Sequence, residues 1–330
     1  MFLLQGSGES VKTSAAHSMC ILGFAFFFLG MISPPVSASD ISHQVGIHAL
    51  TITGETVYET TYQEGVSRLE WPIDVTTGAL TYGISWKDSI EAGLQISACP
   101  WRTISQCMED YDWIDESSYS GRPVHDELDI YSKSSLDSKV MLFGAHARYF
   151  FLSNTFCAFG LNVGYQFQEY DYRAYDTLQE GYGPWQDQTS SVSGPVATYT
   201  VKYELWNLGV SLRAHLDDVI TVTLDTAVVP DVKARDEDTH LRRSRVTASS
   251  CSGYGNQTSL STVFHCPRGW DVNTVCSLAC LRTRGWHSQY WYGDDPASGR
   301  FDDTGQSLTG IRAEIDQHTF SVSIGASYRF

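Results

Sequence analysis

Apart from one apolar run near its start, the chain lacks any stretch long and apolar enough to form a transmembrane helix. This absence excludes a helical inner-membrane protein. It leaves room for a β-barrel, whose strands alternate apolar and polar residues and therefore look only weakly hydrophobic. Positive charge is also scarce, because 22 Lys and Arg face 38 Asp and Glu for a formal charge of −16. Such a surface repels nucleic acid and attracts cationic partners.

Several site signatures are missing too. Eight cysteines occur, and with Cys20 in the leader seven remain, irregularly spaced and without the paired spacing of a zinc site. Whether Cys99 and Cys107 form a disulfide stays open. No GxSxG elbow is present, and no Cys has a local His partner. We therefore expect no metal and no covalent nucleophile, which leaves activated water as the better candidate for any hydrolysis.

The apolar run itself has the features of a secretion signal. It covers residues 19–32, which is shorter than the roughly 20 residues that a spanning helix needs. Val-Ser-Ala at 36–38 fits a signal-peptidase site. We expect residues 1–38 to be a cleaved signal peptide and residues 39–330 to be the mature barrel. The alternative is a short N-terminal membrane anchor.

The end of the chain alternates with a period of two. One face of the last expected strand is apolar and comprises Phe320, Val322, Ile324, Ala326, Tyr328 and Phe330. Residues 141–151, 157–167 and 206–214 repeat the pattern, with Gly, Ser, Gln, Arg and His on their other face. An apolar outer band around a polar lumen is typical of an outer-membrane barrel that ends in an aromatic residue.

Turn signals set the number of strands. Short turns are expected at 87–89, 153–154, 217–218 and 267–269. Longer polar segments are expected near 63–65 and at 115–124, 179–195, 241–255 and 292–308. Four short turns and five long loops give ten strands. The short turns belong on the periplasmic side, together with both termini, and the long loops on the extracellular side.

Two acidic motifs stand at the far ends of rising strands. Asp110 lies about 21 residues above its turn and Asp238 about 20, which is roughly 45–50 Å at about 3.3 Å per residue and a tilt near 45°. The apolar band is only about 25 Å tall. Both motifs are therefore expected at the extracellular mouth. A bulge at Pro230 would change which face the second motif occupies.

The residue types at the mouth suit hydrolysis. His240 is a natural general base, and Asp238 on the same face can orient it. Asp110 and Asp112 form a same-face pair that can share a proton and hold water. Taken singly, each motif is more often solvated charge or a weak calcium site. The pairs at 294–295 and 302–303 are read as solvated or cation-binding charge.

Several segments together resemble the omptins, ten-stranded outer-membrane aspartic endopeptidases of Gram-negative bacteria. The segments Val57-Tyr58, Ser67-Arg68-Leu69-Glu70-Trp71, Ile84-Ser85-Trp86 and Met108-Glu109-Asp110-Tyr111-Asp112-Trp113 look like the first three strands of that family. Asp110 and Asp112 match its aspartate pair, and Asp238 and His240 match its Asp–His dyad.

The resemblance implies roles for six residues. A water bound between Asp110 and His240 would be polarised by the dyad with Asp238, and Asp112 would support the tetrahedral intermediate. Glu55 and Asp236 fall where the family has its acidic first-subsite pocket. That pocket implies cleavage at Arg or Lys and cationic polypeptide substrates.

The lipid motif of the family is altered here. Omptins bind lipopolysaccharide through a Tyr-x-Glu-x-Arg strand motif, whereas this chain has Tyr165-Gln166-Phe167-Gln168-Glu169. Tyr165 is retained, and Lys202 can supply a basic contact. Lipopolysaccharide is the lipid partner implied, and a requirement for it in activity stays open.

The sequence thus predicts an all-β, ten-stranded antiparallel transmembrane barrel with long extracellular loops and short periplasmic turns. It predicts a monomer in the bacterial outer membrane that hydrolyses peptides at basic residues on the extracellular side. One alternative is a non-catalytic barrel that acts as an adhesin or receptor. Another is a barrel lipid hydrolase or acyltransferase, which would want a Ser nucleophile.

Overall fold

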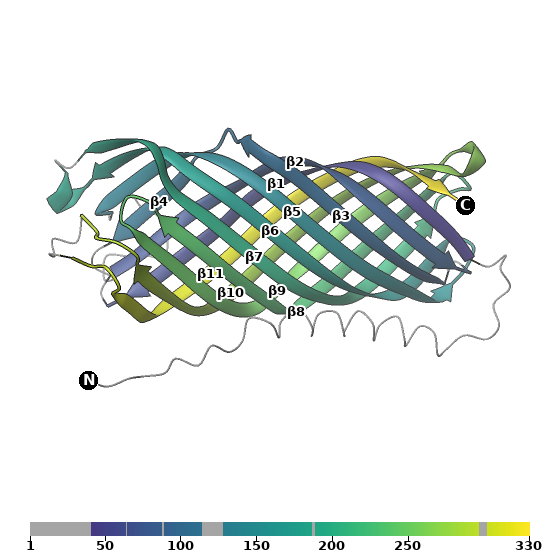
Figure 1. Ribbon diagram of the computed structural model, residues 1–330. Coiled ribbons are helices and arrows are strands. Elements are labelled where there is room, and N and C mark those ends of the chain that lie inside the picture. Colours follow the sequence, from purple (N-terminus) through teal and green to yellow (C-terminus); the bar gives the residue numbers. More distant parts are fainter. Residues whose placement is uncertain (1–40, 64, 88, 114–127, 187–188, 297–301) are drawn as a thin grey trace, which may run out of the picture. The chain divides into compact units, whose positions relative to one another are not determined.

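In the computed structural model, the described residues are 41–63, 65–87, 89–113, 128–186, 189–296 and 302–330. The expected signal peptide and the 115–124 segment lie outside them. From Ser42 to the C-terminus the chain forms one compact unit of antiparallel strands (Figure 1). No helix in the described part of the chain has the length and hydropathy to cross a membrane.

The strands follow one another around the sheet. They are β1 Ile41–Tyr62, β2 Gly65–Trp86, β3 Ile90–Thr103, β4 Met108–Trp113, β5 Ile130–Ser153, β6 Cys157–Gly181, β7 Ser190–His215, β8 Ile220–His240, β9 Arg245–His265, β10 Trp270–Trp291 and β11 Ser307–Arg329. Two single-turn 3₁₀ segments, η4 Gly183–Trp185 and η5 Pro267–Gly269, lie in connections.

The sheet closes into a ring with ten positions. Strand β1 pairs with both β11 and β2, so no edge is left free. Strands β3 and β4 share one position, because both lie between β2 and β5. A break in the ladder separates them at residues 104–107. The predicted ten-stranded barrel is confirmed, with its third strand interrupted.

Side chains alternate between lipid and lumen as the sequence predicts. On β6, Leu161 is 49% exposed on the outside, whereas Asn162 is buried inside. On β7, Leu212 faces out, and Arg213 beside it is buried. Apolar residues on the outside and polar residues on the inside are what a lipid-facing wall around a polar lumen requires.

The four short turns are found where they were expected. They connect β2 to β3, β5 to β6, β7 to β8 and β9 to β10. The expectation of a long loop at 241–255 is wrong, because the chain turns within 241–244 and β9 starts at Arg245. Likewise, β6 and β7 take up the two ends of the 179–195 segment. These stretches are rich in serine, threonine and glycine, which is the composition of a loop, and for this reason they were predicted as loops although they pair as strands.

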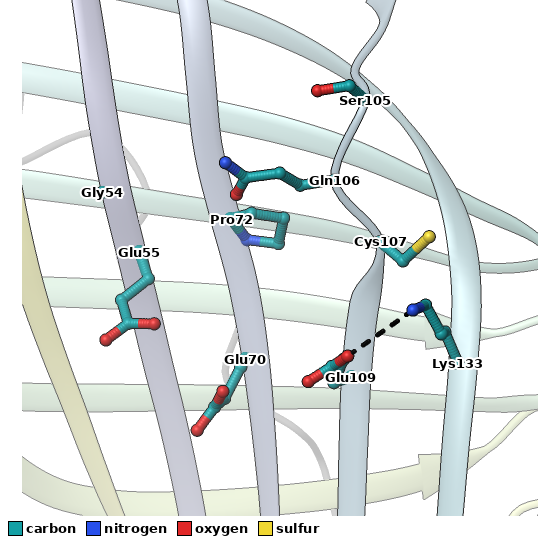
Figure 2. Close-up of a pocket in the computed structure, with 9 residues that line it drawn as sticks. All are labelled: Gly54, Glu55, Glu70, Pro72, Ser105, Gln106, Cys107, Glu109 and Lys133. Carbon is teal, nitrogen blue, oxygen red and sulfur yellow. Dashed lines mark ion pairs between the residues drawn. The ribbon is translucent and has the colours of Figure 1, made fainter.

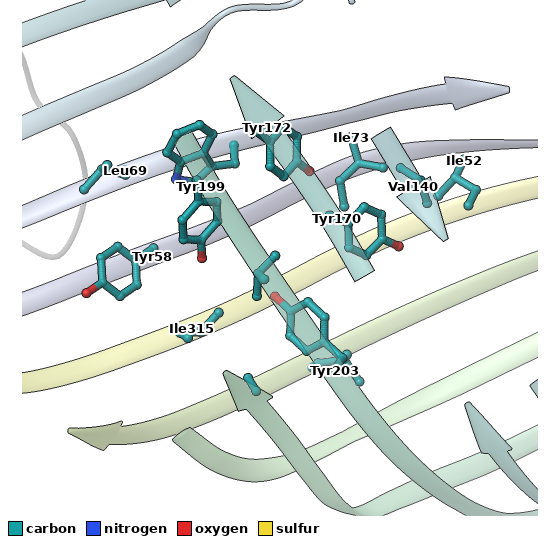
Figure 3. Close-up of a cluster of buried hydrophobic side chains, with 14 of the residues drawn as sticks. Ile52, Tyr58, Leu69, Ile73, Val140, Tyr170, Tyr172, Tyr199, Tyr203 and Ile315 are labelled. Carbon is teal, nitrogen blue, oxygen red and sulfur yellow. The ribbon is translucent and has the colours of Figure 1, made fainter. Parts of the chain in front are cut away.

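Two layers fill the lumen. Nearer the short turns, Arg148 reaches Asp225 at 2.6 Å, and Arg213 reaches Glu91 at 2.6 Å. Above them lies a cluster of aromatic and aliphatic side chains that includes Tyr58, Trp71, Tyr170, Tyr172, Tyr199, Tyr203 and Ile315 (Figure 3). A polar cavity of about 380 Å³ has lining residues from both layers. This aromatic layer lies beneath the candidate functional residues and supports them.

A bulge in β8 determines which residues face the lumen. Below it, odd-numbered residues such as Val229 are buried, and above it the even-numbered Val232, Ala234 and Asp236 are buried. Both neighbours record the extra residue, since β7 and β9 each advance two positions while β8 advances three. A bulge at Pro230, which the sequence left open, is therefore present, and it brings the even-numbered residues of the Asp236–His240 segment inside.

All seven described cysteines are unpaired. Cys99 is buried in the cluster inside the barrel, whereas Cys107 lines a pocket formed by outward-facing residues. The two thiols lie on opposite faces of the wall, so Cys99 and Cys107 do not form a disulfide.

Candidate active site

The aspartate pair is positioned by β4. Met108 on this strand is buried in the lumen cluster, so period-two alternation also turns Asp110 and Asp112 inward. Asp112 lies opposite Ser67 of β2 and accepts a hydrogen bond from it. The Oδ1 atom of Asp110 is buried and, among the described residues, has no hydrogen-bond partner. The pair therefore keeps one acceptor unused.

The Asp–His pair stands at the end of β8. His240 Nε2 lies 3.1 Å from Asp238 Oδ2, and the Asp238 side chain is only 3% exposed. Asp238 Oδ1 has no partner. The backbone carbonyl of Asp238 accepts from Thr247 Oγ1 at 3.4 Å, which ties the strand end to β9. The buried carboxylate is well placed to orient the more accessible imidazole.

The two motifs converge, as the strand arithmetic predicted. Burial raises the pKa of Asp110 well above its usual range, the nearby Asp112 raises it further, and Asp238 is close enough to add to the effect. Burial also raises the pKa of Asp112, while Ser67, Arg243, Arg245 and His240 oppose the shift. Carboxyls crowded in this way hold a shared proton more tightly than isolated ones.

Asp236 occupies the same inner face one step below Asp238. Its Oδ1 accepts the backbone N–H of Ser249 at 2.7 Å, while its Oδ2 is buried without a partner. Burial raises the pKa of Asp236 to about 7, against the hydrogen bonds from Ser249. This carboxylate can therefore receive a cation at one oxygen while the other stays anchored.

Sequence reasoning missed a group of polar residues behind the motifs. Ser249 Oγ lies 3.1 Å from both Tyr58 Oη and His287 Nδ1, and Tyr58 also bonds directly to His287 Nδ1. Gln289 and Arg245 continue the network toward His240. These residues come from three strands, β1, β9 and β10, and they reach His240 on β8, so no local motif could have identified them.

Glu55 is not brought to Asp236. On β1 the buried Thr56 and Tyr58 face the lumen, so the odd-numbered Glu55 faces outward. Figure 2 shows it beside Glu70 and Glu109, in a pocket of about 370 Å³ that also contains Lys133. The predicted Glu55–Asp236 pair is therefore absent. The motif predicts where Glu55 lies along β1, but the alternation of side chains along the strand decides whether it faces the lumen or the outside.

The expected lipid contacts lie on the outer wall. Tyr165 packs against Trp206 with ring centroids 4.9 Å apart. Lys202 pairs with Glu169 at 3.5 Å.

The described residues contain no group of His, Cys, Asp and Glu that could hold a metal ion. In the two acidic pairs read as solvated or cation-binding charge, Asp294 and Asp302 are exposed, whereas Asp295 and Asp303 are buried.

Comparison with known proteins identifies the family of this chain. The sequence profile of the omptin family matches residues 37–330. The structure of the outer membrane protease OmpT from Escherichia coli superposes with a TM-score of 0.74 at 16% identity, over 91% of this chain and 99% of that one. The β domain of the Bordetella autotransporter BrkA matches loosely, with a TM-score of 0.36 at 12% identity over 86% and 98% of the two chains. No curated protein matches the sequence. The family profile covers the whole described barrel, and this chain belongs to the omptin family of outer-membrane proteases.

Proposed function

We propose that the chain hydrolyses peptide bonds at basic residues, using water activated at its extracellular mouth. One observation carries the proposal. Three buried carboxylate oxygens at one end of the barrel, Asp110 Oδ1, Asp236 Oδ2 and Asp238 Oδ1, have no hydrogen-bond partner among the residues that the structure describes. Buried acceptors are normally satisfied, so these positions fit a bound water and a substrate cation.

The reaction follows from the two motifs. His240 takes a proton from a water held against Asp110, and Asp238 stabilises the imidazolium that forms. The water oxygen attacks the peptide carbonyl carbon. The pKa values of Asp110 and Asp112 are raised by burial, so this pair keeps a proton that Asp112 can donate toward the intermediate. His240 then protonates the leaving nitrogen.

Specificity for Arg or Lys falls to Asp236. A guanidinium or ammonium group at its free Oδ2 would pair with a buried carboxylate, and a neutral side chain would leave that charge unsatisfied. Because Glu55 points to the outer wall, we assign the cationic subsite to Asp236 without it. The aromatic layer beneath limits how deep a substrate side chain can reach.

The test uses refolded barrel and a dibasic fluorogenic peptide. Asp238→Asn and His240→Ala should each lower kcat/KM by at least about 10³-fold. Glu237→Gln is the matched control, because Glu237 lies next to Asp238 on the same strand and is exposed on the outer face. Full activity of either site variant would refute the assignment of the dyad.

We also propose that Tyr165 and Lys202 contact lipid headgroups, including those of lipopolysaccharide. Both lie on the outer face of β6 and β7, at the upper part of the wall where charged pairs replace the apolar band. Lys202 is half exposed, so an anionic headgroup can compete for it with Glu169.

A further inference from the structure

The arginines inside the barrel are of two kinds. Arg148 and Arg213 each touch a carboxylate oxygen at 2.6 Å. Arg245, the first residue of β9, forms no ion pair within the described part of the chain. Its charge nonetheless lies close enough to Asp112, Asp238 and Asp295 to be influenced by each of them. A cation kept among carboxylates but unpaired remains available for another anion.

Two neutral groups hold the Arg245 side chain. Nη1 donates to Gln289 Oε1 at 3.2 Å, and Nη2 lies 3.2 Å from His240 Nε2. The Nε atom is buried without a partner. A guanidinium carries five N–H donors, so most of its donors remain unused.

The support behind Arg245 is also neutral. Because Arg only donates, Gln289 must turn its Oε1 toward it, and the amide Nε2 then donates to His287 Nε2 at 3.2 Å. Burial, aided by the charge of Arg245, lowers the pKa of His287 to about 4, so this imidazole stays neutral and can accept. The arrangement fixes the guanidinium without cancelling its charge.

Peptide hydrolysis creates a negative charge that the rest of the site cannot offset well. The carbonyl oxygen becomes an oxyanion when water adds, and donors aimed at that oxygen usually provide the largest single stabilisation. The groups assigned so far are mostly carboxylates, namely Asp110, Asp112, Asp236 and Asp238. An oxyanion among carboxylates needs a nearby positive donor.

We propose that Arg245 is a further catalytic residue, whose guanidinium donates to the oxyanion of the tetrahedral intermediate. The proposal rests on the proposed peptide hydrolysis. As the water oxygen bonds to the carbonyl carbon, the carbonyl π electrons move onto oxygen and the water proton passes to His240. The C–N bond then breaks, the nitrogen takes that proton, and Arg245 remains protonated throughout.

Arg245 and Asp238 both lie near one nitrogen of His240. His240 Nε2 is near Arg245, which only donates, and near Asp238, which only accepts when ionised. An unprotonated Nε2 bonds to Arg245, whereas a protonated Nε2 bonds to Asp238. In the Asp–His dyad, Nε2 carries its proton toward Asp238 and Nδ1 takes the proton from water, so the Arg245 donor near Nε2 is available to the oxyanion.

The first test is kinetic. Arg245→Gln should lower kcat by about 10²–10³-fold with little change in KM, since the donor acts only on the charge that develops. Arg245→Lys should fall between wild type and Gln, because an ammonium cannot span Gln289 and the oxyanion together. Arg242→Gln is the control, since Arg242 is exposed and its Nη2 donates to the backbone carbonyl of Ser193 at 2.8 Å.

A ligand-binding test separates this role from a structural one. A dibasic peptide phosphinate, which carries a tetrahedral anion in place of the scissile amide, should bind Arg245→Gln about 10²-fold more weakly than wild type. The matching reduced-amide peptide should bind both equally. Heat-modifiable migration on gels verifies that each variant is folded.

The outcomes are distinguishable. Equal phosphinate affinity, or a kcat of Arg245→Gln within about threefold of wild type, would overturn the oxyanion role. If His240→Ala is inactive in the same assay, the proposed hydrolysis stands even when the Arg245 proposal fails. If His240→Ala is fully active, the mechanism on which both depend fails.

Discussion

The backbone N–H of Ser249 holds Asp236 Oδ1 at 2.7 Å and leaves Asp236 Oδ2 free and buried. One oxygen of this carboxylate is thus committed to the β9 backbone, and the other faces the site. Several measurable consequences follow from this and from the neighbouring geometry.

The affinity for basic substrates should depend on pH through Asp236. With a pKa of about 7, this carboxyl is charged above that pH and becomes neutral below it. The KM of an Arg substrate should therefore rise about tenfold between pH 8 and pH 6. In Asp236→Asn the KM should be high at both pH values. A citrulline substrate, which is isosteric but neutral, should show no such rise in wild type, and a rise there would contradict the assignment.

Deletion of Pro230 should be tolerated. The deletion removes the extra residue of β8 and leaves the pairs Asp231–Trp206 and Val232–Gly253 in place, so Asp238 still faces the lumen. We expect a folded barrel with kcat/KM within about fivefold of wild type. Deletion of Thr239 is the contrasting variant, because it turns His240 to the other face and should abolish activity. Loss of activity on deleting Pro230 in a folded barrel would be evidence against this account of the bulge.

Trp71 should make a large contribution to stability. It is fully buried and stacks on Tyr199 with centroids 4.5 Å apart. Trp71→Ala should lower the free energy of unfolding by about 3–5 kcal/mol, measured by urea titration in micelles. Trp286, which is 64% exposed, is the control, and its replacement by Ala should cost about 1 kcal/mol or less. Similar losses in the two variants would show that the aromatic layer does not carry the stability.

Lipopolysaccharide binding should respond in opposite directions to changes in one ion pair. Glu169→Gln frees Lys202 from its 3.5 Å contact, so the lipid concentration that gives half-maximal activity should fall about threefold. Lys202→Gln should raise it by a similar factor. Unchanged lipid dependence in both variants would exclude Lys202 as a headgroup contact.

Much of the fold could be predicted because alternation is a local signal. The pattern at Phe320–Phe330 and the short turns were enough to define a ten-stranded barrel. Strand β9 was misread as a loop because its inward-facing residues include Thr247, Ser249 and Cys251. Such small, polar residues suit the inside of the barrel, but in a sequence they have the composition of a loop. A strand that is polar on both faces lacks the alternation of apolar and polar residues from which a strand is predicted.

The site was predictable only in part. The distance of Asp110 and Asp238 from their turns predicted their height. The bulge at Pro230 determines which face Asp238 occupies, and the sequence only left that bulge open. Glu55 was paired with Asp236 from a motif match, although Tyr58 three residues later shows the opposite parity. Arg245, His287 and Gln289 meet His240 only across neighbouring strands, which no single segment of sequence records.

The two layers that fill the lumen have a consequence for the cell. Ion pairs below and packed aromatic rings above occupy the lumen on both sides of a cavity of about 380 Å³. Side chains that fill the lumen narrow any water path along the barrel axis. We therefore expect the protein to add much less conductance to its membrane than an open porin of similar strand number.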